Sequence, residues 1–71
     1  VNQERLSIKQ LSTLAGVSVR TLHFYDQIGL LIPQRVRENN YRFYTQESLL
    51  KLQQILFYRE MEFSLDKIAG I

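Results

Sequence analysis

The sequence of 71 residues contains no cysteine, only one histidine and no paired catalytic carboxylates. Without thiols, the chain can form neither a disulfide nor a thiolate metal or redox site. His23 therefore lacks the partners a metal ion would need, and it has no nucleophile partner for catalysis. A glycine-rich phosphate loop is also absent. We expect no metal, no other cofactor and no enzymatic activity.

Long hydrophobic runs are missing as well. No segment is apolar enough to span a bilayer, and no signal-peptide pattern opens the chain, so we expect no membrane association and a cytoplasmic protein. The hydrophobic content of 45% supports one small domain, residues 1–71, near the lower size limit for independent folding.

The net charge of +2 is too small to indicate nucleic-acid binding by itself, but its placement is informative. Residues 18–42 hold four arginines and two acids, so this middle segment carries the whole excess. The arginines are Arg20, Arg35, Arg37 and Arg42, and the acids are Asp26 and Glu38.

Residues 7–29 predict two short helices joined by a tight turn. Ser7 and Gln10 form an S-x-x-Q capping box that begins the first helix, and Gly16 suits the left-handed position that ends it. Ser18 caps a second helix, which ends at Gly29. A short turn containing glycine between two short helices is typical of a helix-turn-helix.

Apolar spacing predicts the inward sides of these helices. In the second helix Leu22 and Ile28 define that side, and Val17 is expected to fill the angle between the helices. In the first helix the spacing is shared by Ile8, Leu11, Leu14 and Ala15.

A hairpin is predicted at about residues 34–44. Pro33 ends helical structure and begins an extended segment. Polarity then alternates on both sides of Glu38-Asn39-Asn40, and asparagine tolerates the positive φ of a tight turn. The two strands would form a β-wing.

Two further helices complete the expected fold. Thr45 caps one at about 46–61, and Ser64 caps another at about 65–71, with Phe63 packing beneath. The apolar stripe of the longer helix is Leu49, Leu52, Ile55 and Leu56, and the shorter helix turns Leu65 and Ile68 inward. The fold class is mostly α with a small β-hairpin, a winged helix-turn-helix of about four helices and a two-stranded wing.

The second helix carries the sharpest functional signal. Arg20 lies in its first turn, where recognition helices commonly contact DNA, and His23 shares its face. Thr21, between them, is also a candidate DNA contact. Ser18 can present a hydroxyl and the helix N-terminus to a phosphate. The alternative is a solvated Arg20 and a Ser18 that serves only as a cap. The preceding helix and turn favour DNA.

The aromatic pair Phe24 and Tyr25 allows two interpretations. Consecutive helical residues point about 100° apart, so one narrow face cannot bury both. One is expected in the core. The Tyr25 hydroxyl either reaches the surface and donates to a phosphate or stays with the core.

The wing clusters arginines with Tyr41 and Tyr44, which suits phosphate or minor-groove contact. Arg42 is the preferred contact, while Arg35 and Arg37 fit equally well as charges that keep an exposed hairpin soluble. Taken alone, Arg59 reads as an exposed charge or an ion-pair partner of nearby acids, Glu60 or Glu62.

In combination, several strings are specific: AGVSVRTL, FYD, IGLL, YRFY and FSLDKI. From about Leu6 to Ile71 the chain resembles the N-terminal DNA-binding domain of the MerR family of bacterial transcription regulators. It looks most like the multidrug-type and thiostrepton-type activators. The resemblance implies DNA contacts at Ser18, Arg20, Thr21, His23, Phe24, Tyr25, Tyr41, Arg42 and Arg59.

The resemblance also implies a mechanism. Such regulators bind a palindromic operator as homodimers, and they bend and untwist an overlong promoter spacer so that RNA polymerase engages both promoter elements. The family's long dimerisation helix and effector domain are absent from this sequence, so we expect a fragment that is mostly monomeric and binds double-stranded promoter DNA weakly.

Four positions depart from the family pattern. His23 stands where arginine is frequent, and Phe24 where tyrosine is common, which removes a hydroxyl. Asn40 and Glu62 occupy positions where glycine is frequent, so the wing turn and the bend before the last helix are expected to be less relaxed.

Two other functions fit the same residues. One is a MerR-like architectural or excisionase-type protein that bends DNA without an effector domain. The other is a winged-helix module whose Arg20 face docks on an acidic protein, and competition by unrelated duplex DNA would separate it from a DNA-binding protein.

Overall fold

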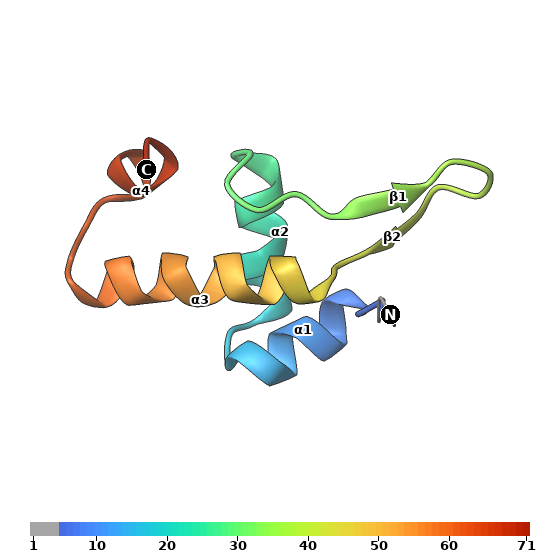
Figure 1. The fold of residues 1–71 in the computed structure, drawn as a ribbon, viewed down its shortest axis with the longest axis horizontal. Helices are drawn as coiled ribbons and strands as arrows, with labels where there is room; N and C mark the ends of the chain where they lie inside the picture. Colours follow the sequence, from blue (N-terminus) through green and yellow to red (C-terminus); the bar gives the residue numbers. More distant parts are fainter. Residues whose placement is uncertain (1–4) are drawn as a thin grey trace.

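The computed structural model describes residues 5–71 and contains, in that part of the chain, four helices and one two-stranded antiparallel hairpin (Figure 1). This confirms the expected fold class; α4 ends at Ala69, two residues earlier than predicted. The elements are α1 (Ile8–Ala15), α2 (Val19–Gln27), β1 (Gln34–Val36), β2 (Tyr41–Phe43), α3 (Gln46–Glu60) and α4 (Leu65–Ala69). No helix among the described residues is both long enough and apolar enough to cross a membrane.

Each of the four helices begins at a hydroxyl side chain. The predicted capping box of α1 is present, with Ser7 and Gln10 satisfying each other's backbone N–H groups. A second box, formed by Thr45 and Ser48, begins α3 and was not recognised in the sequence. Caps of this kind each stabilise a helix by about 1 kcal/mol. The four caps are Ser7, Ser18, Thr45 and Ser64.

The helices α2 and α3 end in the same motif. After α2, Gly29 has φ 74° and the Leu30 N–H donates to the Tyr25 carbonyl at 2.8 Å. After α3, Glu62 has φ 66° and the Phe63 N–H donates to the Tyr58 carbonyl at 3.0 Å. This is the Schellman arrangement, which favours glycine at the left-handed position. In the wing turn, Asn40 has φ 58°. Asn40 and Glu62 therefore both adopt the left-handed conformation that glycine favours, as the sequence predicted.

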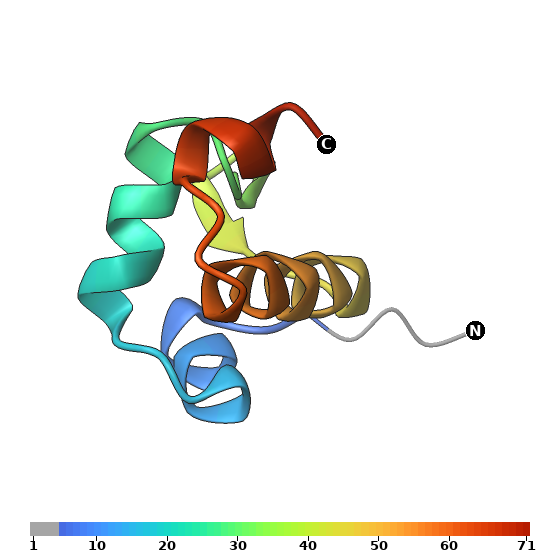
Figure 2. The same cartoon turned by 90° about the vertical axis from the view of Figure 1, so that its left-hand side faces the viewer.

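Three leucines, one from each of α1, α2 and α3, form the centre of the core. Leu11, Leu22 and Leu52 are all 0% exposed. Viewed along α3, α1 lies below it, α2 beside it and α4 above it (Figure 2). Around the centre pack Leu6, Tyr25, Leu30, Leu31, Tyr44, Ile55 and Ile68, with Val17, Leu49, Leu56, Phe63 and Leu65 partly buried at the edge.

Two residues expected to face inward do not. Ile28 is 46% exposed because it is the C-cap of α2 and follows the end of the helical repeat; Tyr25, three residues after Leu22, takes the inward position instead. Leu14 is 58% exposed because it lies about 60° around the helix from Leu11, on the side away from Ile8 and Ala15, which pack against the core.

The wing is a hairpin with its base fixed to the segment before α1. Arg35 lies opposite Arg42 in the strand register, and a turn over residues 37–40 joins the strands. At the base, Leu6 and Tyr44 exchange two backbone hydrogen bonds of 2.7 Å each. The wing therefore extends from the body of the molecule, and its base is held by these backbone hydrogen bonds (Figure 1).

Candidate nucleic-acid interface

The outer side of α2 is polar and begins at its cap. Arg20 and His23 are both exposed, three residues apart on one face. The Ser18 Oγ accepts the backbone N–H of Thr21 at 3.0 Å and lies 2.9 Å from the Thr21 hydroxyl. Ser18 thus has the role of a cap, and its hydroxyl and that of Thr21 are already engaged with each other.

The aromatic pair of α2 is divided between surface and core, as expected. Phe24 is 45% exposed, whereas Tyr25 is 6% exposed and packs against the core cluster. Their ring centroids lie 6.2 Å apart in a tilted arrangement. Phe24 therefore offers an apolar surface beside His23, while Tyr25 supports the helix from inside.

The wing has an arginine face and an aromatic face, because side chains alternate along a strand. Arg35 and Arg42 lie opposite each other on one face. On the other face, the rings of Tyr41 and Phe43 stack with centroids 6.2 Å apart, and the Arg5 guanidinium lies 4.5 Å from the Phe43 centroid. Arg5 was missed in the sequence because only the folded wing places an aromatic ring beneath it.

An ion pair joins the wing to α2. Arg42 Nη1 lies 4.0 Å from Asp26 Oδ2, and it is the one ion pair between side chains within residues 5–71. Burial raises the pKa of the Tyr44 phenol above its ordinary value, the Asp26 carboxylate raises it further, and the Arg42 guanidinium opposes this. Both charges therefore act on the same phenol at the base of the wing.

Sequence reasoning did not single out Asp26, although a signal was present. It lies in the last turn of α2, where an acid is unfavourable next to the negative end of the helix dipole. A nearby cation offsets that cost, but the sequence does not show which segment supplies it.

Arg59 lies beside the turn that precedes α2, whereas the wing contacts the last turn of α2. Of the two alternatives for Arg59, the exposed charge is found rather than an ion pair with Glu60 or Glu62; its Nη1 donates to the Phe63 carbonyl at 3.0 Å, which the backbone turn after α3 brings within reach. Arg59 also lines a shallow depression together with residues 15–17 of the turn between α1 and α2. Arginines therefore lie near both ends of α2.

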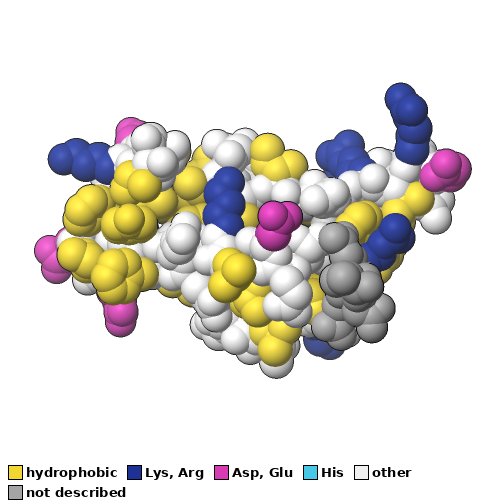
Figure 3. Space-filling model, viewed as in Figure 1, with side chains coloured by type: hydrophobic (Ala, Val, Ile, Leu, Met, Phe, Trp, Pro, Cys, Tyr) yellow, Lys and Arg dark blue, Asp and Glu magenta, His cyan; other side chains and the backbone are white. Residues whose placement is uncertain are grey.

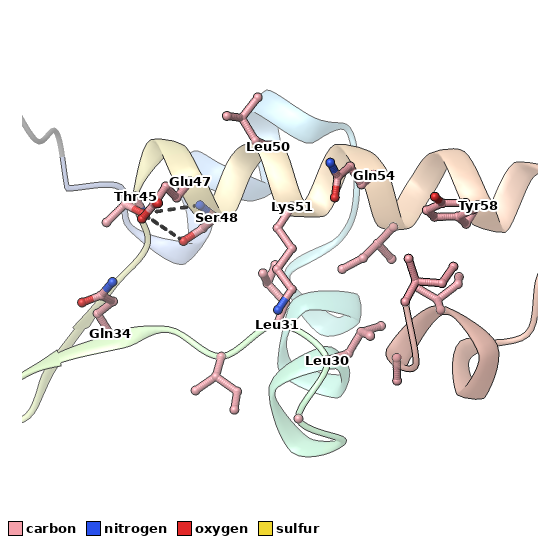
Figure 4. Close-up of a pocket in the computed structure, with 16 residues that line it drawn as sticks. Leu30, Leu31, Gln34, Thr45, Glu47, Ser48, Leu50, Lys51, Gln54 and Tyr58 are labelled. Carbon is pink, nitrogen blue, oxygen red and sulfur yellow. Dashed lines mark hydrogen bonds between the residues drawn. The ribbon is translucent and has the colours of Figure 1, made fainter.

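A separate groove lies on the other side of the molecule. Its volume is about 780 Å³, and it runs between α3, α4 and the segment that follows α2. Lys51 extends across it toward Leu31 (Figure 4). Apolar side chains gather over α3 and α4 on this face (Figure 3), whereas α2 lies behind it. No group of three metal-ligating side chains comes together among the described residues.

Comparisons with known proteins agree on one family. The model described as "MerR HTH family regulatory protein" matches residues 6–71. The HTH-type transcriptional regulator SkgA of Caulobacter vibrioides is 55% identical over 64 residues, 90% of this chain and 25% of SkgA. The HTH-type transcriptional activator TipA of Streptomyces coelicolor is 51% identical over 65 residues, 92% of this chain and 26% of TipA. The chain thus spans about a quarter of the length of these relatives.

Solved structures show the same fold. The crystal structure of SkgA from Caulobacter crescentus superposes with a TM-score of 0.88 at 49% identity, covering 97% of this chain and 50% of that one. EcmrR, solved by cryo-EM as an EcmrR–DNA complex in EcmrR-RPo, superposes with a TM-score of 0.78 at 38% identity, covering 92% and 24%.

Proposed function

The chain belongs to the MerR family of HTH regulatory proteins, and on that premise we propose that α2 enters the major groove of duplex DNA while arginines near its two ends contact the flanking phosphates. The chain is the DNA-binding domain of a transcriptional regulator and not an enzyme. The observation that carries the proposal is the exposed polar face of α2 with Arg42 near one end and Arg59 near the other.

The dimensions of α2 suit the groove. An α-helix with its side chains is about 10–12 Å across, close to the width of about 12 Å of the major groove, and the nine residues of α2 provide about 13.5 Å of helix to lie in it. Arg20 would read a guanine edge through two hydrogen bonds, and the exposed ring of Phe24 would contact a thymine methyl. The proposed contacts are Ser18, Arg20, Thr21, His23, Phe24, Tyr25, Tyr41, Arg42 and Arg59.

These residues have unequal roles in the proposal. Ser18 supplies the backbone N–H groups that follow it rather than a free hydroxyl, because that hydroxyl caps the helix. Tyr25 would contribute only its hydroxyl, because the residue packs in the core and is 6% exposed. Arg42 and Arg59 contact phosphates, which fixes the register of α2 without reading sequence.

The proposed mechanism of regulation is promoter distortion by a homodimer. Two copies on a palindromic operator would bend and untwist an overlong spacer, so that RNA polymerase engages both promoter elements. The similarity to EcmrR, solved with DNA, supports this reading. Effector sensing would belong to a further domain of the whole protein, since the relatives are about four times longer than the matched region.

Selection from a random duplex pool tests the proposal. The chain is immobilised, bound duplexes are amplified through repeated rounds, and the enriched sequence is measured for affinity against a scrambled duplex of equal length. We expect an enriched half-site and tighter binding to it. Equal binding to both duplexes, or binding to an acidic protein that unrelated duplex DNA does not displace, would refute it.

A further inference from the structure

Asp26 occupies a position that is unfavourable in two respects. It lies in the last turn of α2, at the negative end of the helix dipole. It also lies within the surface proposed to approach DNA phosphates, which repel a carboxylate. Its side chain is only 24% exposed, so it is held against the protein rather than directed into solvent.

The neighbourhood of Asp26 explains its placement. Arg35 and Arg42 are directly opposite each other across the hairpin, and like charges in such a pair are destabilising. The Asp26 carboxylate, 4.0 Å from Arg42, offsets one of these charges and connects α2 to β2. Asp26 and Arg42 both act on the Tyr44 phenol, so the pair is located above the anchored base of the wing.

The pair leaves Arg42 able to bind DNA. A guanidinium carries five N–H donors in a fixed fork, and one carboxylate oxygen at 4.0 Å leaves most of them free. The Arg42 side chain remains 50% exposed. An ion pair this exposed contributes little to folding stability. Its role would instead be to restrict the orientations of a long, flexible side chain before DNA arrives.

We propose that Asp26 is a positioning residue, which holds the Arg42 guanidinium at the junction of α2 and the wing in the orientation that meets a DNA phosphate. The inference rests on the proposed function. Ordering a side chain in advance removes a cost that is otherwise incurred on binding, and for one arginine this corresponds to about threefold to tenfold in affinity.

Two variants with the same change of charge test the role of Asp26. Asp26→Asn and Glu38→Gln each remove one negative charge, and Glu38 lies in the exposed turn of the wing. If Asp26 positions Arg42, Asp26→Asn weakens binding to the selected duplex about threefold to tenfold, whereas Glu38→Gln strengthens it. If both variants strengthen binding by a similar factor, Asp26 is only a repulsive charge and the inference is wrong.

A double-mutant cycle identifies the partner. In an Arg42→Gln background, Asp26→Asn should no longer weaken binding, because the side chain it orients is gone. A loss of the same size in both backgrounds would show that Asp26 acts elsewhere. Thermal melts check that every variant folds, and Asp26→Asn should not lower the melting temperature, since it removes an acid from the negative end of a helix.

A measurement without DNA separates this inference from the proposed function. Heteronuclear relaxation of the arginine Nε–H groups in the free chain should show Arg42 restrained relative to Arg37, and equally mobile after Asp26→Asn. Equal mobility in the unsubstituted chain overturns the positioning role even where DNA binding is confirmed. If the restraint is present but the chain binds no duplex, the proposed function fails and the phosphate-orienting role fails with it.

Discussion

Arg20 is expected to supply sequence discrimination with almost no contribution to stability. It is exposed in the first turn of α2, and within residues 5–71 its side chain makes no hydrogen bond or ion pair that would stabilise the fold. Arg20→Ala should weaken binding to the selected duplex by about 1–3 kcal/mol. It should change the free energy of unfolding by no more than about 0.5 kcal/mol. Fluorescence anisotropy and calorimetry measure the two quantities. Lys9→Ala, an exposed cation on α1, is the control, and a large fall in melting temperature for Arg20→Ala would contradict this role.

Arg42 should behave differently because phosphates carry no sequence information. Arg42→Ala is expected to weaken binding to selected and scrambled duplexes by similar factors and to lower the slope of log K against log salt by about one. Titrations over a range of salt concentrations give that slope. A loss confined to the selected duplex, with an unchanged slope, would instead place Arg42 on a base edge.

Tyr44 makes stability depend on pH in the alkaline range. Burial and the Asp26 charge raise its folded-state pKa above the ordinary 10.0, so the unfolded chain releases the proton first. The contribution to stability is therefore fully present below pH 10 and is lost as pH rises through the folded pKa. Urea unfolding below and above pH 10 should show a smaller alkaline loss for Tyr44→Phe. Tyr41→Phe, at a 47% exposed position, should leave the loss as it was; equal losses in all three chains would exclude Tyr44 as the cause.

At the scale of elements, the shared ending of α2 and α3 allows a matched comparison. Glu62 adopts φ 66°, which is costly for a residue with a Cβ, whereas Gly29 adopts φ 74° at the same point of its motif. Glu62→Gly should stabilise the fold by about 0.5–1 kcal/mol, after the entropy of glycine in the unfolded chain is counted, and raise the melting temperature by about 4–8 °C per kcal/mol.

Gly29→Ala provides the opposite change. No atom lies within 4 Å of the Cβ it would add, so its cost comes from backbone conformation alone. We expect a loss of about 1 kcal/mol. Thermal melts of Glu62→Gly and Gly29→Ala under the same conditions test the comparison. A higher melting temperature for Gly29→Ala would show that the left-handed backbone conformation does not determine these changes in stability.

The sequence predicted the helices and strands well because short local motifs mark where they begin and end. Each helix begins at a serine or threonine cap, and these residues could be read without knowing the fold. Side-chain orientation near helix ends was less predictable, because Ile28 lies outside the repeat that buries Leu22 and Tyr25. The contacts of Asp26, Arg5 and Arg59 could not be predicted from spacing, since each depends on how a separate segment packs beside it.

At the scale of the whole molecule, the fold separates the proposed recognition face, the exposed side of α2, from the packed core. The chain extends over 38 × 22 × 21 Å, and the wing extends from a body whose core is centred on leucines of α1, α2 and α3 (Figure 1). The exposed side of α2 lies opposite the face on which apolar side chains gather (Figures 2 and 3). Substitutions on the recognition face should therefore change DNA binding without disturbing Leu11, Leu22 and Leu52 at the centre of the core.

One such molecule presents one proposed recognition helix, α2, so we expect its affinity for duplex DNA to be low unless two copies are joined. The longest helix, α3, buries Leu52 and Ile55 in the chain's own core and leaves Leu50 and Phe57 exposed, but its 15 residues make only about two heptads, fewer than the three to four that sustain a coiled coil. We expect sedimentation equilibrium to give a monomer of about 8.4 kDa.

Two copies joined by a flexible linker should bind a duplex with two selected half-sites about 10²–10⁴ times more tightly than a single copy, because the second contact becomes intramolecular. The gain should disappear on a duplex with one half-site, which serves as the control. A tight dimer of the unlinked chain, or an equal gain on both duplexes, would show that the chain associates through a surface of its own rather than through the symmetry of its DNA site.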